Sequence, residues 1–187
     1  MTRIVGGSVG GRRIQAPPGG STRPTTDRVR EALFSAVEAR IGTLADRRFL
    51  DLYAGSGAVG LEARSRGAAA VTLVEQDRPV AALIRRNARE LGFSEVTVVQ
   101  GSVERWAARP GGDTAYDVVF ADPPYPVSAD VLGGVLVMLA EHGHLAPSAL
   151  LILERSRRDP GWTWPSGFRE VRARRYGETM LWYGLGP

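Results

Sequence analysis

The chain has 187 residues, of which 43% are hydrophobic and 24% charged, and its 24 basic residues, all arginine, exceed the acidic ones by four. This length fits one domain with a sizeable core. The absence of cysteine excludes disulfides and thiolate metal sites. No apolar run approaches the roughly 18 residues of a membrane-spanning helix, and the first six residues do not resemble a signal peptide, so we expect a soluble, cytoplasmic protein.

The N-terminal segment predicts a small extension. Residues 3–15 place two short β-like runs around glycines, which is typical of a β-hairpin, and residues 17–24 form a Gly/Pro/Ser linker. A helix should begin at Thr26 or Asp27, both favourable N-cap residues, and end near Arg40.

Arginines are concentrated near the two ends of the chain. Residues 1–30 hold six arginines and one acid, and residues 155–175 hold seven arginines and two acids. Such clusters suit a polyanion such as RNA, although a solvated basic surface is the alternative. The candidate RNA contacts are Arg12, Arg13, Arg23, Arg28 and Arg30.

Residues 49–60 predict a strand, a glycine loop and the start of a helix. Gly55, Gly57 and Gly60 fit the G-x-G-x-x-G fingerprint of nucleotide cofactors, and Glu75 lies twenty residues after Gly55. Asp51 would repel a pyrophosphate but suits the cationic amine and sulfonium of S-adenosylmethionine, and Glu75 can accept hydrogen bonds from ribose hydroxyls. The loop therefore favours S-adenosylmethionine over a nicotinamide.

Strands and helices alternate through the rest of the chain. We expect strands over 71–74, 96–99, 118–121 and 150–153, helices over 79–91 and 130–142, a short helix carrying Trp106, and a final antiparallel pair over 168–175 and 179–183. This alternation predicts an α/β fold with a mainly parallel sheet.

The apolar run at 118–121 stops at Asp122-Pro123-Pro124-Tyr125. The two prolines fix φ and remove two N–H donors, so the chain can neither continue the strand nor start a helix there. A carboxylate, a stiff turn and an aromatic ring therefore lie at the carboxyl end of a strand, where α/β sheets bind ligands. We predict that this turn shares one pocket with the glycine loop.

Over its whole length the chain resembles the class I S-adenosylmethionine-dependent methyltransferases, and more narrowly the bacterial enzymes that methylate N2 of guanine 966 in 16S rRNA. The narrower resemblance rests on Arg3-Ile-Val-Gly-Gly, Gly11-Arg12-Arg13, the segments 23–34 and 51–57, Asp122-Pro123-Pro124-Tyr125, and 175–179. It implies a Rossmann-like, seven-stranded, mainly parallel sheet with helices on both faces. Residues 1–24 would then be an RNA-contacting hairpin and linker, and 25–187 the methyltransferase domain.

The resemblance also assigns roles to residues. Asp122 and the carbonyl of Pro123 would accept hydrogen bonds from the N2 amine, and Tyr125 would stack on the base. The cofactor would contact Asp51, Tyr53, Ala54, Gly55, Ser56, Gly57, Glu75, Gln76, Ser102, Val103 and Asp122. Ser102 stands where many relatives carry an acid, so the backbone near Val103 is the alternative contact for adenine. No metal is expected, and the partner would be 16S rRNA, within the small subunit or an assembly intermediate, bound by a monomer.

Other classes remain open. The nearest are methyltransferases acting on DNA adenine N6 or protein glutamine, although 187 residues leave little room for the target-recognition region of a DNA enzyme. A nicotinamide-dependent oxidoreductase would use the glycine loop but explain neither Asp51 nor the turn at Asp122. A non-enzymatic RNA-binding module would explain only the arginines.

Overall fold

The computed structural model describes residues 2–17, 26–112, 115–124, 126–159 and 161–187. The elements in chain order are β1 (Thr2–Arg3), β2 (Arg13–Ile14), α1 (Asp27–Ile41), β3 (Arg48–Leu52), α2 (Ala58–Ser65), β4 (Ala70–Glu75), α3 (Arg78–Leu91), β5 (Val96–Gln100), α4 (Val103–Ala107), β6 (Tyr116–Ala121), α5 (Ala129–Glu141), β7 (Leu145–Ser156), β8 (Arg169–Tyr176) and β9 (Thr179–Leu185).

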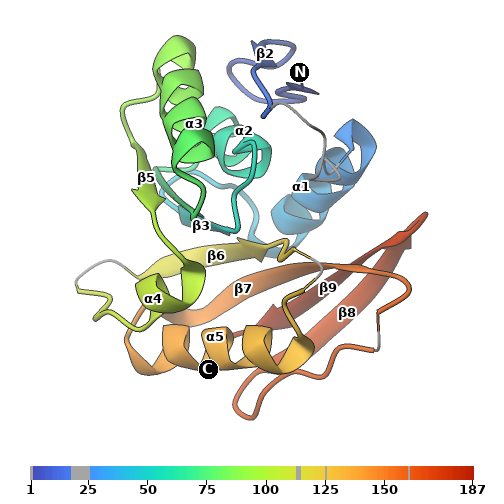
Figure 1. Cartoon of the computed structure of the whole chain (residues 1–187). Coiled ribbons are helices and arrows are strands. Elements are labelled where there is room, and N and C mark those ends of the chain that lie inside the picture. Colours follow the sequence, from blue (N-terminus) through green and yellow to red (C-terminus); the bar gives the residue numbers. More distant parts are fainter. Residues whose placement is uncertain (1, 18–25, 113–114, 125, 160) are drawn as a thin grey trace.

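Seven strands form one sheet in the order β5-β4-β3-β6-β7-β9-β8 (Figure 1). Strands β3 to β7 run parallel, whereas β9 runs antiparallel to both β7 and β8. Parallel neighbouring strands must be joined by crossover connections, which are usually helices. The alternation of apolar runs with helical segments in the sequence indicates such connections. The predicted seven-stranded, mainly parallel sheet is confirmed.

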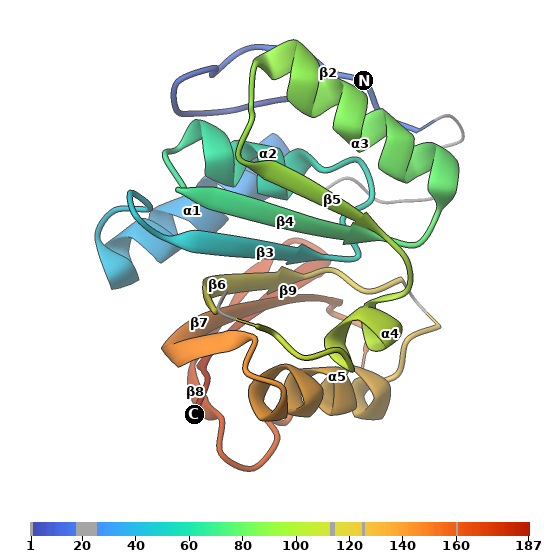
Figure 2. The same ribbon diagram turned by 90° about the vertical axis from the view of Figure 1, so that its left-hand side faces the viewer.

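Helices cover both faces of the sheet (Figure 2). On one face α1, α2 and α3 pack on the strands through residues such as Phe34, Val59 and Ile84. On the other face α4 and α5 pack through residues such as Val103 and Leu136. No helix in the described ranges is long and apolar enough to cross a membrane.

Most element boundaries follow local signals in the sequence. The side chain of Thr26 accepts a hydrogen bond from the N–H of Val29 and begins α1, as predicted. Strand β7 is longer than the predicted 150–153 at both ends, because Leu145 pairs with Tyr116 of β6 and Ser156 pairs with Thr179 of β9. This extension carries Glu154 to the carboxyl edge of the sheet.

The predicted N-terminal hairpin is confirmed and lies on the outer side of α2 and α3 (Figures 1 and 2). Ile4 and Ile14 are buried against Leu61 and Ala88 of these helices. Burial of each isoleucine contributes roughly 1.5–3 kcal/mol. Since an isolated two-stranded hairpin is marginal in water, this packing fixes it to the domain.

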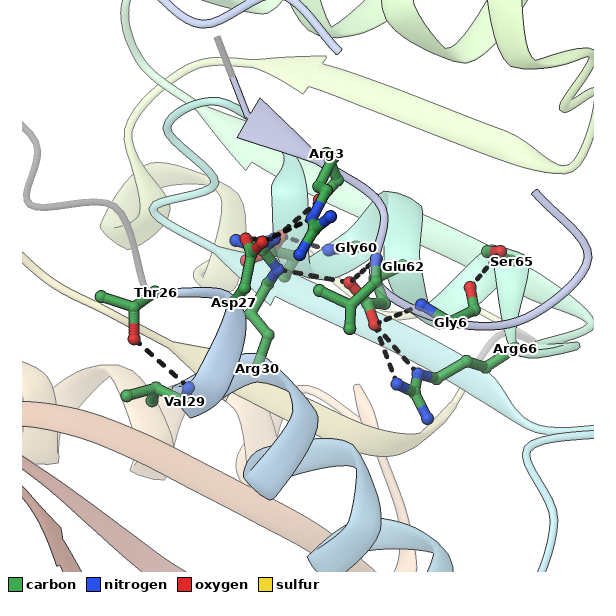
Figure 3. A network of polar contacts seen from close by, with 12 residues as sticks. Arg3, Gly6, Thr26, Asp27, Val29, Arg30, Gly60, Glu62, Ser65 and Arg66 are labelled. Carbon is green, nitrogen blue, oxygen red and sulfur yellow. Dashed lines mark hydrogen bonds and ion pairs between the residues drawn. The ribbon is translucent and has the colours of Figure 1, made fainter. Parts of the chain in front are cut away.

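A buried polar network also holds the hairpin (Figure 3). The carboxylate of Glu62 accepts hydrogen bonds from the N–H groups of Val5 and Gly6 and from the guanidinium groups of Arg30 and Arg66. Arg30 is fully buried, and its Nη2 also donates to the carbonyl of Arg3 at 2.7 Å. The prediction that Arg30 contacts RNA is therefore wrong, because its side chain joins α1 to α2 inside the protein.

Candidate active site

A cavity of about 500 Å³ opens at the carboxyl ends of the parallel strands. Asp51 of β3 and Glu75 of β4 line it together with the glycine loop. Asp122 and Pro123, which follow β6, line it as well. The prediction that the glycine loop and the proline turn share one pocket is confirmed.

Most of the predicted site residues lie in the wall of this cavity. They are Asp51, Tyr53, Ala54, Gly55, Ser56, Glu75, Gln76, Val103, Asp122 and Pro123. Two predicted residues in the described part of the chain, Gly57 and Ser102, do not line it. The Ser102 side chain instead caps α4 by accepting the N–H of Arg105 at 3.3 Å. Tyr125 and Arg23 lie outside the described residues.

Gly57 allows the start of α2 to pack closely on α3, and Gly60 allows α2 to pack closely on the sheet. Gly57 precedes α2 with φ of 76°, and a Cβ there would lie 2.9 Å from Cγ2 of Ile84. At Gly60 a Cβ would lie 2.7 Å from Cδ2 of Leu73. Both contacts are too short for any side chain, so these glycines set the loop geometry through packing.

Asp51 is buried at the base of the cavity, and its Oδ2 accepts the N–H of Gly60 at 2.8 Å. Burial raises the pKa of this carboxyl to about 8, although the bond from Gly60 opposes the shift. The nearby charge of Glu75 is a smaller contribution to the same shift. A cation bound here would relieve both penalties.

Glu75 holds the glycine loop in place. Its Oε2 accepts the N–H of Gly55 and its Oε1 accepts the N–H of Asp77, both at 2.8 Å. A carboxylate offers about four acceptor sites, so each oxygen can take a further hydroxyl donor. The position of Glu75 at the end of β4 therefore suits recognition of a ribose.

Tyr53 turns the chain out of β3 with φ of 59°, a left-handed conformation that costs about 1–3 kcal/mol for a residue with a side chain. Its hydroxyl donates to Oε1 of Glu104 at 3.3 Å. Burial, with the neighbouring Glu104, raises the pKa of this phenol and keeps it a donor. The strained turn thus places an aromatic ring in the cavity wall.

Asp122 lies beside Glu154 in the cavity. Strands β6 and β7 pair in register with Ala121 opposite Leu153, so the next residues of each strand are neighbours on the same side of the sheet. Burial raises the pKa of Asp122 well above its usual range, and the charges of Glu154 and Asp51 add to the shift. The proximity of like charges disfavours ionisation of both carboxyls at once.

Sequence reasoning missed Glu154, although a signal was present. This acid directly follows the buried run 150–153, as Asp122 follows 118–121. It also missed Arg155, whose Nη1 donates to the carbonyl of Val127 at 2.9 Å and holds the segment after the proline turn. Further wall residues are Ser156 and Asp159, which follow Glu154 along the chain, and Glu178 and Thr179, which the pairing of β7 with β9 brings to the site.

The remaining candidates for RNA contact lie on the surface. Arg12, Arg13 and Arg28 are exposed, in the hairpin and the first turn of α1. Nη2 of Arg12 donates to the carbonyl of Glu90 at 2.6 Å, which ties the hairpin turn to the end of α3. Their positive charges face solvent and are accessible to a polyanion.

Comparison with known sequences identifies relatives over most of the chain. The family model described as Conserved hypothetical protein 95 matches residues 2–184. The Ribosomal RNA small subunit methyltransferase D of Escherichia coli strain K12 is 40% identical over 152 residues, which cover 81% of this chain and 73% of that protein. The protein of the same name from Haemophilus influenzae is 34% identical over 160 residues, covering 84% of this chain and 80% of that protein.

Solved structures agree with these sequence matches. A protein from Escherichia coli described as a methyltransferase has a TM-score of 0.87 at 34% identity, and the match covers 99% of this chain and 97% of that chain. A protein from Thermus thermophilus has a TM-score of 0.80 at 34% identity, and the match covers 98% of both chains. The chain therefore belongs to the Conserved hypothetical protein 95 family, and within it to the bacterial small-subunit ribosomal RNA methyltransferases of the class I fold.

Proposed function

We propose that this protein transfers a methyl group from S-adenosylmethionine to the exocyclic N2 of guanine 966 in 16S rRNA. The observation that carries the proposal is the convergence of the glycine loop and the Asp122-Pro123 turn on one cavity. The first segment suits the cofactor and the second suits an amine that is to be methylated. The similarity to ribosomal RNA small subunit methyltransferases supplies the class of substrate.

The residues of the cavity fit S-adenosylmethionine. When bound, this molecule supplies an electrophilic methyl group carried by a sulfonium. Asp51 would attract its positive charges, and Glu75 would accept hydrogen bonds from the ribose, each charge-assisted bond contributing roughly 1.5–3 kcal/mol. Tyr53, Ala54, Gly55, Ser56, Gln76 and Val103 would complete the contacts.

The protein then has to orient the amine, because the N2 lone pair of guanine is delocalised into the ring. Asp122 would accept one N–H of the amine and the carbonyl of Pro123 the other, which aligns the nitrogen about 3–3.5 Å from the methyl group. The nearby Arg155 and the N–H donors of the bound amine favour the ionised form of Asp122, and its raised pKa makes this carboxylate a stronger acceptor for the departing amine proton. Tyr125 would stack on the base, a contact worth about 1–3 kcal/mol.

RNA binding is assigned to the N-terminal hairpin and the start of α1. Arg12, Arg13 and Arg28 would contact phosphates, with Arg23 as a further candidate in the linker, so that 1–24 serves as an RNA-contacting extension of the domain 25–187. We place the reaction in the bacterial cytoplasm, with a monomer acting on the small subunit or an assembly intermediate. No observation favours a DNA adenine, protein glutamine or nicotinamide substrate.

The test is transfer of labelled methyl to small ribosomal subunits that lack the modification, with free 16S rRNA alongside, followed by nucleoside analysis. We expect N2-methylguanosine, and we expect Asp122→Ala to abolish turnover while the affinity for S-adenosylmethionine changes by no more than a few-fold. Asp130→Asn, an exposed acid in the first turn of α5, is the control and should retain turnover. Unchanged turnover in Asp122→Ala, or a different methylated nucleoside, would contradict the proposal.

A further inference from the structure

Glu154 is the carboxylate of the cavity wall that follows Leu153 of β7, and it belongs neither to the glycine loop nor to the proline turn. Only 8% of its surface is exposed, yet it lines the cavity together with Asp122. Adjacent parallel strands lie about 4.8 Å apart, so the pairing of Ala121 with Leu153 places the two acids next to each other. Two neighbouring acids repel each other when both are charged, and N–H donors of a ligand would favour their charged forms.

The surroundings of Glu154 hold its side chain in place. Thr179 of β9 donates its hydroxyl to Oε1 of Glu154 at 3.4 Å, and Thr179 itself lines the cavity. Backbone pairing of Ser156 with Thr179 keeps the two strands in register at this point. The carboxylate is thus fixed by the sheet and does not depend on a loop.

The purines differ in the hydrogen-bonding groups that they would present to Glu154 and Asp122. The edge of guanine that carries N2 offers N1–H and the N2 amine as adjacent donors, whereas adenine and 2-aminopurine have an unprotonated N1 that can only accept. An ionised carboxylate can only accept hydrogen bonds. Guanine presents an N–H donor to each position, which favours the ionised form of both carboxyls in the complex and offsets the repulsion between them in the free protein. Two neighbouring carboxylates therefore match guanine, and they oppose any base whose N1 carries a lone pair.

We infer that Glu154 selects guanine by accepting the N1–H of the target base while Asp122 accepts an N–H of its N2 amine. This inference rests on the proposed function and deepens it. The N2–CH₃ bond forms as the S–CH₃ bond breaks, the electron pair of the broken bond stays on sulfur, and the extra proton of N2 passes to Asp122. Glu154 withdraws no proton, but its hydrogen bond to N1–H increases electron density at N2.

The test uses small subunits reconstituted with 16S rRNA that carries either guanine or 2-aminopurine at the target position. Both bases keep the N2 amine, but only guanine has N1–H. We expect wild-type kcat/KM for 2-aminopurine to be lower by at least about a hundredfold, as for other sites built to pair with a missing N–H. Glu154→Gln should slow transfer to guanine. It should also reduce the ratio of kcat/KM for guanine to kcat/KM for 2-aminopurine at least about tenfold, because a glutamine amide can donate to the unprotonated N1 of 2-aminopurine.

Two controls separate the possible results. Glu141→Gln removes an exposed charge at the end of α5 and should keep the wild-type preference. Glu154→Gln should not lower the melting temperature, because it removes the repulsion with Asp122, and it should leave the affinity for S-adenosylmethionine unchanged. These two measurements separate selection of the base from a structural role. A wild-type preference retained in Glu154→Gln, or equal wild-type turnover of both bases, would overturn the role of Glu154 and leave the proposed function intact. The wild-type comparison stands even where the variant fails to fold, and no transfer to guanine by the wild type overturns both proposals.

Discussion

The carboxylate of Glu62 lies 3.2 Å from Nε of Arg30, and both side chains are fully buried. Glu62 belongs to α2, Arg30 to α1, and the same carboxylate accepts the backbone N–H groups of Val5 and Gly6 in the hairpin. One acid therefore joins three segments. Since α2 begins at the glycine loop, the orientation of the hairpin is linked to the helix that shapes the cofactor side of the cavity.

Glu62→Gln should destabilise the protein strongly. The substitution removes one of the two carboxylates paired with the buried guanidinium of Arg30, whose Nη2 keeps Asp27 at 2.8 Å. Complete loss of a buried partner costs about 3–5 kcal/mol, so we expect a loss toward the lower end of this range. We expect the urea midpoint of unfolding to fall accordingly, and proteases to cleave the N-terminal hairpin before the rest of the domain unfolds.

Glu38→Gln is the matched control for this network. Glu38 pairs with Arg66 at 3.4 Å, but its side chain is 43% exposed, so its loss should cost less than about 1 kcal/mol. Equal urea midpoints for the two variants would show that the buried carboxylate does not hold the hairpin.

Asp51 should make the stability of the free protein depend on pH. Its pKa is about 8 in the folded protein against 3.8 for an unperturbed carboxyl. Between these values the folded state keeps a proton that the unfolded state has released, so the contribution of Asp51 to stability is present at low pH and is lost as pH rises through about 8. Asp51→Asn removes this loss, and its amide oxygen can still accept the N–H of Gly60. We expect the variant to melt at a higher temperature than the wild type at about pH 9.

The same group should govern binding of S-adenosylmethionine. Because only the ionised form attracts a cation, wild-type affinity should rise as pH increases toward about 8, by up to about tenfold per pH unit. Asp51→Asn should bind S-adenosylmethionine weakly, and its affinity should lack the rise with pH that Asp51 causes. Any rise that remains in the variant comes from titration of the ligand's own amine. Calorimetry at about pH 6, 7 and 8 measures both, and parallel pH profiles for the two proteins would contradict the role of Asp51.

The parts of the fold that follow from local chemistry were predictable from the sequence. Thr26 marks the start of α1, and Asp122 with its prolines marks the end of β6, because capping and proline geometry act over a few residues. The burial of Arg30 was not predictable, since its partner Glu62 lies 32 residues away and an arginine near a basic segment suggests a surface position.

Glu154 shows the same limit within the site. Its pattern, an acid after a buried run, was visible, but its place beside Asp122 depends on β6 pairing with β7. The approach of Thr179 depends on β9 entering the sheet antiparallel to β7, which no spacing in the sequence specifies. Long-range strand order therefore decided which polar residues joined the motif residues in the cavity.

Charge reversal of the hairpin arginines should weaken RNA binding without affecting the cavity. Arg12→Glu combined with Arg13→Glu removes two candidate phosphate contacts, so the slope of log affinity against log salt should fall by roughly two. Arg40→Glu combined with Arg109→Glu changes the net charge equally at exposed positions outside the hairpin and is the control. Filter binding to 16S rRNA over a salt series measures the slope, and S-adenosylmethionine affinity should stay constant. If both double variants bind RNA with the same slope, the hairpin does not form the phosphate contacts and the effect is one of net charge alone.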